Sequence, residues 1–116
     1  MRFTISIKKN KDFRRLYHAG RSAVGPFVAV YCRKNRTDKN RLGITVGTKV
    51  GKAVCRNRVR RRLREAYRLM EDKLVCGYDI VIVARVRCAG AEFSSLSASL
   101  NTLFSKLGVM KDEVNT

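Results

Sequence analysis

Apolar side chains recur every three to four positions between residues 10 and 18, which is the spacing of one face of a helix. They are Phe13, Leu16 and Tyr17. We therefore predict a short amphipathic helix over this stretch. Asn10 is a residue type that caps helices at their start, and Gly20 marks the end of the pattern.

Strand patterns occupy the next part of the chain and return once later. Phe27–Arg33 is rich in strand-forming residues, and apolar positions alternate with glycine and threonine over Leu42–Val46. The polar stretch Lys34–Arg41 between them predicts a hairpin loop, and Arg21–Val24 predicts a short additional strand. The run Tyr78–Arg85 is continuously apolar in its centre, which is typical of a strand buried on both faces.

Two longer helical patterns complete the chain, from about Val54 to Lys73 and from about Ser94 to Leu107. The apolar stripe of the first helix is Cys55, Val59, Leu63, Ala66, Tyr67 and Met70, and that of the second is Leu96, Leu100, Leu103, Phe104 and Leu107. Gly77 closes the connection after the first helix, and Gly108 ends the second. Both stripes need a partner surface to cover them.

The order of elements predicted is α-β-β-β-α-β-α, and a mixed sheet covered by helices buries these stripes economically. We expect an α/β sandwich of two layers. A length of 116 residues suits a single domain over residues 1–116. Flexible ends are expected at about residues 1–7 and 109–116.

The formal net charge of +17, from 26 Lys and Arg against 9 acids, indicates a polyanionic partner. A membrane surface is the alternative, but it needs an amphipathic helix whose apolar face is free, and both long stripes are needed for the core. No apolar run approaches the length of about 20 residues that spans a bilayer. The start of the chain is too polar for a signal peptide, so we expect a soluble cytoplasmic protein.

The residue types of metal and nuclease centres are sparse. The four cysteines, Cys32, Cys55, Cys76 and Cys88, contain no CxxC pair, and His18 is the single histidine. We expect reduced thiols in or near the core and no zinc site. The nine acids are scattered, which argues against a two-metal nuclease, and His18 is expected on the surface.

Six arginines fall between positions 56 and 64 on the first long helix. One broad side of that helix is predicted to carry Arg56, Asn57, Arg60, Arg61, Arg64 and Arg68, with Arg58 and Arg62 on the other flank near Glu65. Like charges at this spacing destabilise a helix, whereas guanidinium groups bind phosphate oxygens well. Contact with nucleic acid explains the array better than a solvated face does. The preceding Gly47–Ala53 segment lacks the glycine spacing and the final Ser or Thr of a phosphate-binding loop.

Aromatic residues are the second indication of a nucleic-acid partner. Phe13 and Tyr17 lie one turn apart, and Phe27 and Tyr31 share one face of a predicted strand. Single-stranded RNA is commonly held by stacking on such rings within a basic groove. The alternative is that these rings are core residues. That alternative is strongest for Phe13 and Phe27, because tyrosine hydroxyls prefer a wet edge.

The chain resembles the bacterial ribonuclease P protein family over residues 8 to 107. Its arginine-rich signature is Gly51-Lys52-Ala53-Val54, then Arg56-Asn57-Arg58-Val59-Arg60-Arg61, then Arg64-Glu65. Lys9–Tyr17 and Gly20–Ser22 are similar to the opening helix of the family and the residues after it. Arg41–Val46 and Tyr78–Arg85 are similar to the strands on either side of the signature.

The resemblance implies a four-stranded mixed sheet with a left-handed βαβ crossover, as in the second domain of a small-subunit ribosomal protein. It implies a holoenzyme in which RNA is the catalyst, with Mg²⁺ bound mainly by that RNA, no organic cofactor and no catalytic side chain. The expected partners are the catalytic RNA and precursor tRNA, with no membrane and no obligate protein partner. The expected role is to help remove the 5′ leader.

The resemblance also assigns site residues. Those expected to face RNA are Lys49, Lys52, Arg56, Asn57, Arg58, Arg60, Arg61, Arg64 and Arg68. A cleft beside the first helix is expected to hold the 5′ leader on Phe13, Tyr17 and Tyr31, with Val30 as the alternative to Tyr31. Two rival functions are considered. A ribosomal protein or RNA chaperone shares the charge and the aromatic residues, whereas a free-standing nuclease is disfavoured by the missing carboxylate or histidine cluster.

Overall fold

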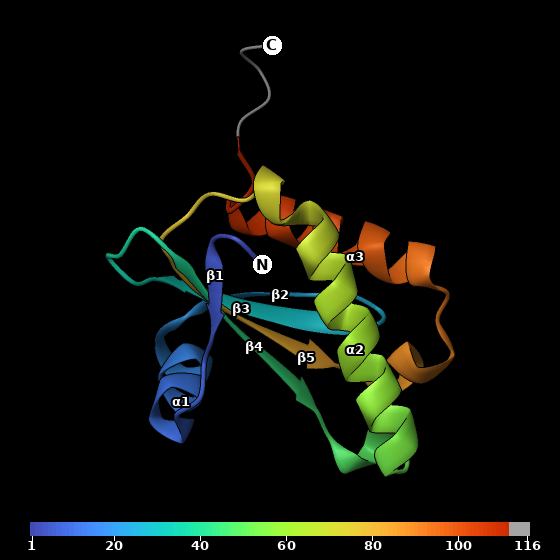
Figure 1. Ribbon diagram of the computed structural model, residues 1–116. Coiled ribbons are helices and arrows are strands. Elements are labelled where there is room, and N and C mark those ends of the chain that lie inside the picture. Colours follow the sequence, from blue (N-terminus) through green and yellow to red (C-terminus); the bar gives the residue numbers. More distant parts are fainter. Residues whose placement is uncertain (112–116) are drawn as a thin grey trace.

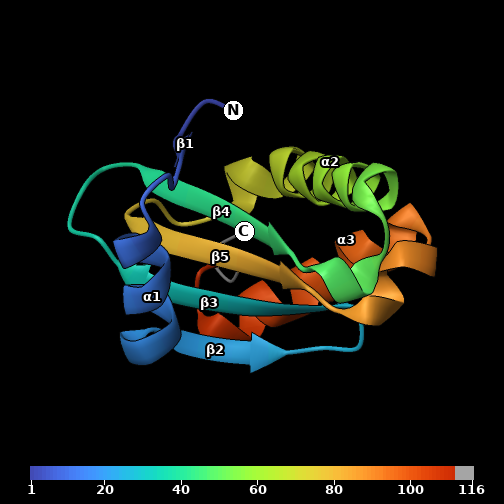
Figure 2. The same cartoon turned by 90° about the horizontal axis from the view of Figure 1, so that it is seen from below.

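The computed structural model describes residues 1–111 and consists of one mixed sheet with helices on both faces (Figures 1 and 2). The strands are β1 (Thr4–Ser6), β2 (Arg21–Val24), β3 (Val28–Lys34), β4 (Asn40–Val46) and β5 (Tyr78–Ala84), and the helices are α1 (Asn10–Ala19), α2 (Ala53–Met70) and α3 (Phe93–Leu107). Figure 2 shows α1 across one face of the sheet, with α2 and α3 on the other side. The predicted α/β class with its two long amphipathic helices is confirmed. The expected two-layer arrangement is wrong, because α1 covers the face of the sheet opposite to α2 and α3.

The sheet has five strands in the order β1-β4-β5-β3-β2, so the four-strand expectation is wrong. The additional strand, β1, pairs parallel to the start of β4. It extends over only Thr4–Ser6, which is too short for a recognisable alternating pattern. Long-range contacts hold it in place, because the backbone N–H of Asn40 donates to the carbonyl of Phe3 at 2.8 Å, and that of Ile7 donates to Leu42 at 2.9 Å.

The predicted hairpin between β3 and β4 is also wrong, because β5 lies between them. β5 pairs parallel with β4 and antiparallel with β3. The polar stretch between β3 and β4 therefore passes the end of β5 rather than joining neighbouring strands. The apolar centre of β5 explains its position, since Ile80, Val81 and Ile82 are all fully buried and need cover on both faces.

The main core lies between the sheet and the pair α2 and α3. Both predicted helix stripes point into it, and Val59, Leu63, Ala66, Tyr67, Met70, Leu96, Leu100, Leu103, Phe104 and Leu107 are buried. The rings of Tyr67 and Phe104 meet edge to face with centroids 6.2 Å apart. A smaller core under α1 contains Ile7, Leu16 and Val81. Within residues 1–111, no helix is long and apolar enough to cross a membrane.

Several element boundaries differ from the expectation. Lys9, not Asn10, occupies the cap position of α1, and no side chain bonds there. α2 ends at Met70, and the expected last turn is a 3₁₀ helix over Glu71–Lys73. The expected frayed tail is packed at its start, because Val109 is fully buried and its carbonyl accepts from the Val75 N–H at 2.8 Å. The rest of that predicted tail, 112–116, lies outside the described residues.

Candidate nucleic-acid interface

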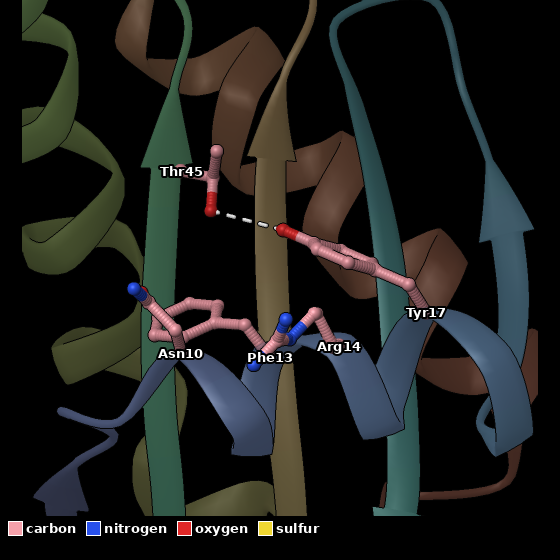
Figure 3. A pocket seen from close by; sticks show the side chains of 5 residues that line it. All are labelled: Asn10, Phe13, Arg14, Tyr17 and Thr45. Carbon is pink, nitrogen blue, oxygen red and sulfur yellow. Dashed lines mark hydrogen bonds between the residues drawn. The ribbon is translucent and has the colours of Figure 1, made fainter.

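A cavity of about 450 Å³ opens between α1 and the exposed face of the sheet, and we call it the aromatic cleft (Figure 3). Its lining consists of Asn10, Phe13, Arg14, Tyr17 and Thr45. The hydroxyl of Tyr17 lies 3.2 Å from that of Thr45 on β4, so one hydrogen bond spans the cleft. Tyr17 remains 40% exposed, which leaves much of its ring free to stack on a ligand.

The structure brings the three predicted cleft aromatics, Phe13, Tyr17 and Tyr31, together. Tyr31 on β3 contacts Tyr17 edge to face, with ring centroids 5.0 Å apart. Val30 is fully buried in the core under α2 and α3, on the opposite face of the strand. Tyr31 is therefore on the same side of the sheet as the cleft, where it supports Tyr17, although it does not itself line the cavity. Phe13 and Tyr31 are half-buried against the smaller core, so each ring has a packed side as well as an accessible one.

Three residues of the cleft, Asn10, Arg14 and Thr45, were not predicted. Asn10 and Arg14 are four positions apart on the helix that carries both aromatic residues, so helical spacing alone could have placed them together. Thr45 alternates on β4 with the buried Leu42 and with Val46. The face of β4 that carries Thr45 could have been inferred from this alternation. Its contact with Tyr17 could not, because that contact depends on how α1 packs on the sheet.

Close packing between Gly43 and Phe13 sets the position of the Phe13 ring. A Cβ atom at Gly43 would lie 2.5 Å from a carbon of that ring. We expect Gly43→Ala to displace the ring and to lower the free energy of unfolding by about 1–3 kcal/mol. Denaturant unfolding measures the free energy, and the NMR chemical shifts of the Phe13 ring report its displacement. In the control, Gly90→Ala, the new methyl group meets no atom within 4 Å, so equal losses in the two variants would contradict the packing argument.

A partly buried ionic network links β4, β5 and α1. Arg41 on β4 donates to both carboxylate oxygens of Asp79 on β5, at 2.8 and 2.6 Å, and to Asp12 on α1 at 3.4 Å. Asn35 donates to Asp79 at 2.9 Å. Burial alone would raise the pKa of the Asp79 carboxyl, but hydrogen bonds from Arg41 and Asn35 outweigh it and lower that pKa below its ordinary value.

This network predicts an acid-sensitive fold. A carboxyl whose pKa is lower in the folded protein stabilises the fold above its ordinary pKa, and that contribution is lost as the pH falls through the folded value. We expect the free energy of unfolding to fall below about pH 4. Asp79→Asn should make the fall shallower and cost about 1.5–3 kcal/mol at neutral pH, because Arg41 loses its main acceptor. Denaturant titrations from pH 2 to 7 measure both effects, and an unchanged acid slope would contradict the role of Asp79.

The cations of α2 and of the loop before it divide into two groups in the structure, and all of them except Arg62 were predicted to contact RNA. Four arginines are held by the protein itself. Arg56 donates to the Gly51 carbonyl at 3.2 Å, Arg60 to the Asn57 side chain at 3.1 Å, Arg62 to the Ala91 carbonyl at 2.8 Å, and Arg68 pairs with Glu65. The hydrogen bond from Arg68 lowers the pKa of Glu65, so the charge of Arg68 is partly offset.

The second group is unengaged. Its side chains are exposed and make no hydrogen bond to any other residue within 1–111. The group consists of Lys49, Lys52, Arg58, Arg61 and Arg64. Lys49 and Lys52 flank the start of α2, where no side chain caps the helix. The free N–H groups of that first turn add positive potential to the same surface. This end of α2 can therefore bind phosphate groups through side chains and backbone.

The acidic residues with partners serve structural roles. Asp12 and Asp79 bind Arg41, and both carboxylate oxygens of Glu71 accept from the backbone N–H groups of Arg2 and Phe3. The described part of the chain has no cluster of three His, Cys, Asp or Glu residues that could hold a metal ion. His18 is exposed in the last turn of α1. These residues do not fit a protein-bound magnesium site.

The four cysteines are free thiols in different environments. Cys32 and Cys88 are buried, and burial raises the pKa of the Cys88 thiol to about 11. Cys55 is half-buried in the first turn of α2. Cys76 is exposed, so the expectation of a location in or near the core fails for this residue, which lies in the connection before β5.

Comparison with known proteins identifies close relatives. The sequence model of a family described as Ribonuclease P matches residues 1–108. The chain is 43% identical over 107 residues to the ribonuclease P protein component of Clostridioides difficile, covering 91% of this chain and 94% of the relative. It is 45% identical over 112 residues to that of Clostridium acetobutylicum, covering 94% of each.

Solved structures agree with this result. The RNase P protein of Staphylococcus aureus superposes with a TM-score of 0.83 at 33% identity, covering 91% of this chain and 97% of the relative. That of Thermotoga maritima superposes with a TM-score of 0.77 at 32% identity, covering 84% and 94%. Both superpositions cover most of the chain, so the fold of the sheet and helices is shared with these two proteins.

Proposed function

Because this chain belongs to the ribonuclease P protein family and is a subunit of that endoribonuclease, we propose that it binds the catalytic RNA through α2 and the 5′ leader of precursor tRNA in the aromatic cleft. The holoenzyme acts in tRNA processing. Association with ribonuclease P RNA follows from membership of the family.

The observation that carries the leader assignment is the exposed aromatic cleft. Tyr17 is partly exposed, is supported from behind by Tyr31 and is tethered to Thr45 across the opening. An open cleft with a rigid ring suits single-stranded RNA, whose unstacked bases pack on aromatic faces. Arg14 in the same lining can neutralise a leader phosphate. Mature tRNA lacks the leader, so these contacts favour substrate over product.

The unengaged cations at the start of α2 support contact with the catalytic RNA. α2 connects the parallel neighbours β4 and β5, and the crossover is expected to keep the left hand implied by the family resemblance. The loop after β4 carries Lys49 and Lys52 to the same end as Arg58. The rest of the expected RNA-facing set has side chains that already bind partners within the protein. These residues are Arg56, Asn57, Arg60 and Arg68.

Catalysis is assigned to the RNA partner. Magnesium would be held by RNA phosphates, and the basic surface would lower the divalent-ion concentration needed by screening phosphate repulsion. The side chains of this chain bind and orient the RNA. The buried free thiols Cys32 and Cys88 are compatible with the expected cytoplasmic location, where thiols stay reduced.

Cleavage of precursor tRNA by a bacterial ribonuclease P RNA at low magnesium, with and without this protein, tests the proposal. We expect strong protein-dependent cleavage at the mature 5′ end. RNA binding without stimulation would instead support a ribosomal protein or an RNA chaperone. Cleavage by the protein with no added RNA would support the free-standing nuclease.

A further inference from the structure

A second cavity lies between β1, β4 and α2, and we call it the amino-terminal pocket. Its volume is about 240 Å³, and its lining is Met1, Thr4, Ile5, Ser6, Leu42, Ile44 and Arg64. Leu42 and Ile44 alternate along β4 with Thr45, which lines the aromatic cleft. The two cavities therefore lie on opposite faces of β4, and neither is an extension of the other.

Contacts from the end of α2 hold the outer wall of this pocket in place. The buried Glu71 carboxylate accepts from the backbone N–H groups of Arg2 and Phe3, at 2.9 and 3.1 Å. The hydroxyl of Thr4 lies 2.8 Å from that of the buried Tyr67. Pairing between β1 and β4 adds main-chain hydrogen bonds. The wall is thus formed before any ligand arrives, which lowers the entropy cost of binding.

The chemistry of the lining combines one cation, hydroxyl groups and apolar side chains. Arg64 is exposed, and its guanidinium has no hydrogen-bond partner within the described chain. Ser6 is exposed, and Ile5 is 53% exposed at the edge of the sheet. Among the described residues, no carboxylate lines the pocket, and the Glu71 carboxylate that binds the backbone of Arg2 and Phe3 already has both oxygens bonded. A ligand with a flat apolar part and a phosphate matches this set.

We infer that the amino-terminal pocket takes one unstacked nucleotide of the catalytic RNA, with its base against Ile44 and its phosphate on Arg64. Sequence-specific RNA recognition commonly uses bases turned out of a helix in this way. The catalytic RNA is the source, because Arg64 lies one turn from Arg61 on the α2 surface assigned to that RNA, whereas the leader lies across β4. The inference thus rests on the proposed function.

The test measures the affinity of the full chain for a bacterial ribonuclease P RNA without substrate. Ser6→Glu places a carboxylate beside Arg64 and is expected to weaken binding by about tenfold, while Ser6→Gln, of the same size, stays within about twofold of wild type. Asn101→Glu, on the exposed side of α3, changes the net charge equally and controls for long-range electrostatics. Thermal unfolding of each variant checks the fold.

Two further measurements test whether Ser6 and Arg64 act on the same RNA nucleotide. Ser6→Glu combined with Arg64→Ala should lose less than the sum of the single effects, since both act on one phosphate. Chemical probing should show one unpaired RNA nucleotide that the wild-type and Ser6→Gln proteins protect and Ser6→Glu does not. Equal weakening by Ser6→Glu and Asn101→Glu, or unchanged protection, overturns the pocket. A wild-type chain that fails to bind this RNA overturns the proposed function itself.

Discussion

Tyr17→Ala is expected to weaken binding of precursor tRNA to the holoenzyme by about tenfold, because stacking of a base on an aromatic ring contributes roughly 1–3 kcal/mol. Binding of mature tRNA should stay unchanged, since it has no leader to place in the aromatic cleft. Tyr17 is the suitable probe because its ring is exposed, while Phe13 and Tyr31 also support the smaller core. Equilibrium binding of both tRNAs to the reconstituted holoenzyme measures the effect.

Tyr17→Phe is the matched control. It keeps the ring and removes the hydroxyl that meets Thr45 at 3.2 Å. We expect it to retain nearly all of the preference for precursor tRNA, because stacking and not this hydrogen bond carries the affinity. If Tyr17→Ala weakened precursor and mature tRNA equally, the leader would not lie in the aromatic cleft. An equal loss with Tyr17→Phe would assign the effect to the bridge to Thr45.

The double substitution Arg58→Ala with Arg61→Ala is expected to weaken assembly with ribonuclease P RNA by about tenfold or more at moderate salt. Both side chains are exposed and free of protein partners in the described structure, so their loss removes phosphate contacts and leaves the fold intact. The slope of log affinity against log salt should become shallower by about 1.5, since each lost phosphate contact removes about 0.7–0.9.

Lys106→Ala with Lys111→Ala is the control for that experiment. It removes the same formal charge from exposed positions at the end of α3 and just beyond it, where the backbone of Lys111 meets Lys73 after the end of α2 and not the start of α2 that carries Arg58 and Arg61. We expect a smaller loss of affinity and a nearly unchanged salt slope. If both double variants lost affinity to the same extent, RNA binding would depend on net charge alone, and the assignment of the α2 surface would fail.

Local patterns in the sequence were sufficient for much of the fold. The helical stripes of α2 and α3 placed Leu63 and Leu100 in the core, because a periodicity of 3.6 residues depends only on near neighbours along the chain. The short strand Arg21–Val24 was predicted with its observed ends. The signature around Arg56–Arg61 identified the family for the same reason, since its spacing is contained within one helix.

Strand order was decided by tertiary structure. Nothing in the residues on either side of the stretch between β3 and β4 shows that β5 inserts between them. The position of β5 depends on burying both of its faces at once, and only the packed helices supply that cover. β1 is a similar case, because the three residues Thr4–Ser6 are held by partners far along the chain, such as Asn40.

The site shows the same division. Local sequence patterns were enough to identify the residue types of the site: an arginine-rich helix, aromatic rings one turn apart and a large positive charge. Tertiary structure decided which of them are available. Arg62 reaches the carbonyl of Ala91, while Arg61 beside it stays free, and Tyr31 rather than Val30 meets Tyr17. Tertiary packing decides which side chains touch each other. The residues that it brings together are far apart along the chain, so no periodic pattern in the sequence reveals their contact.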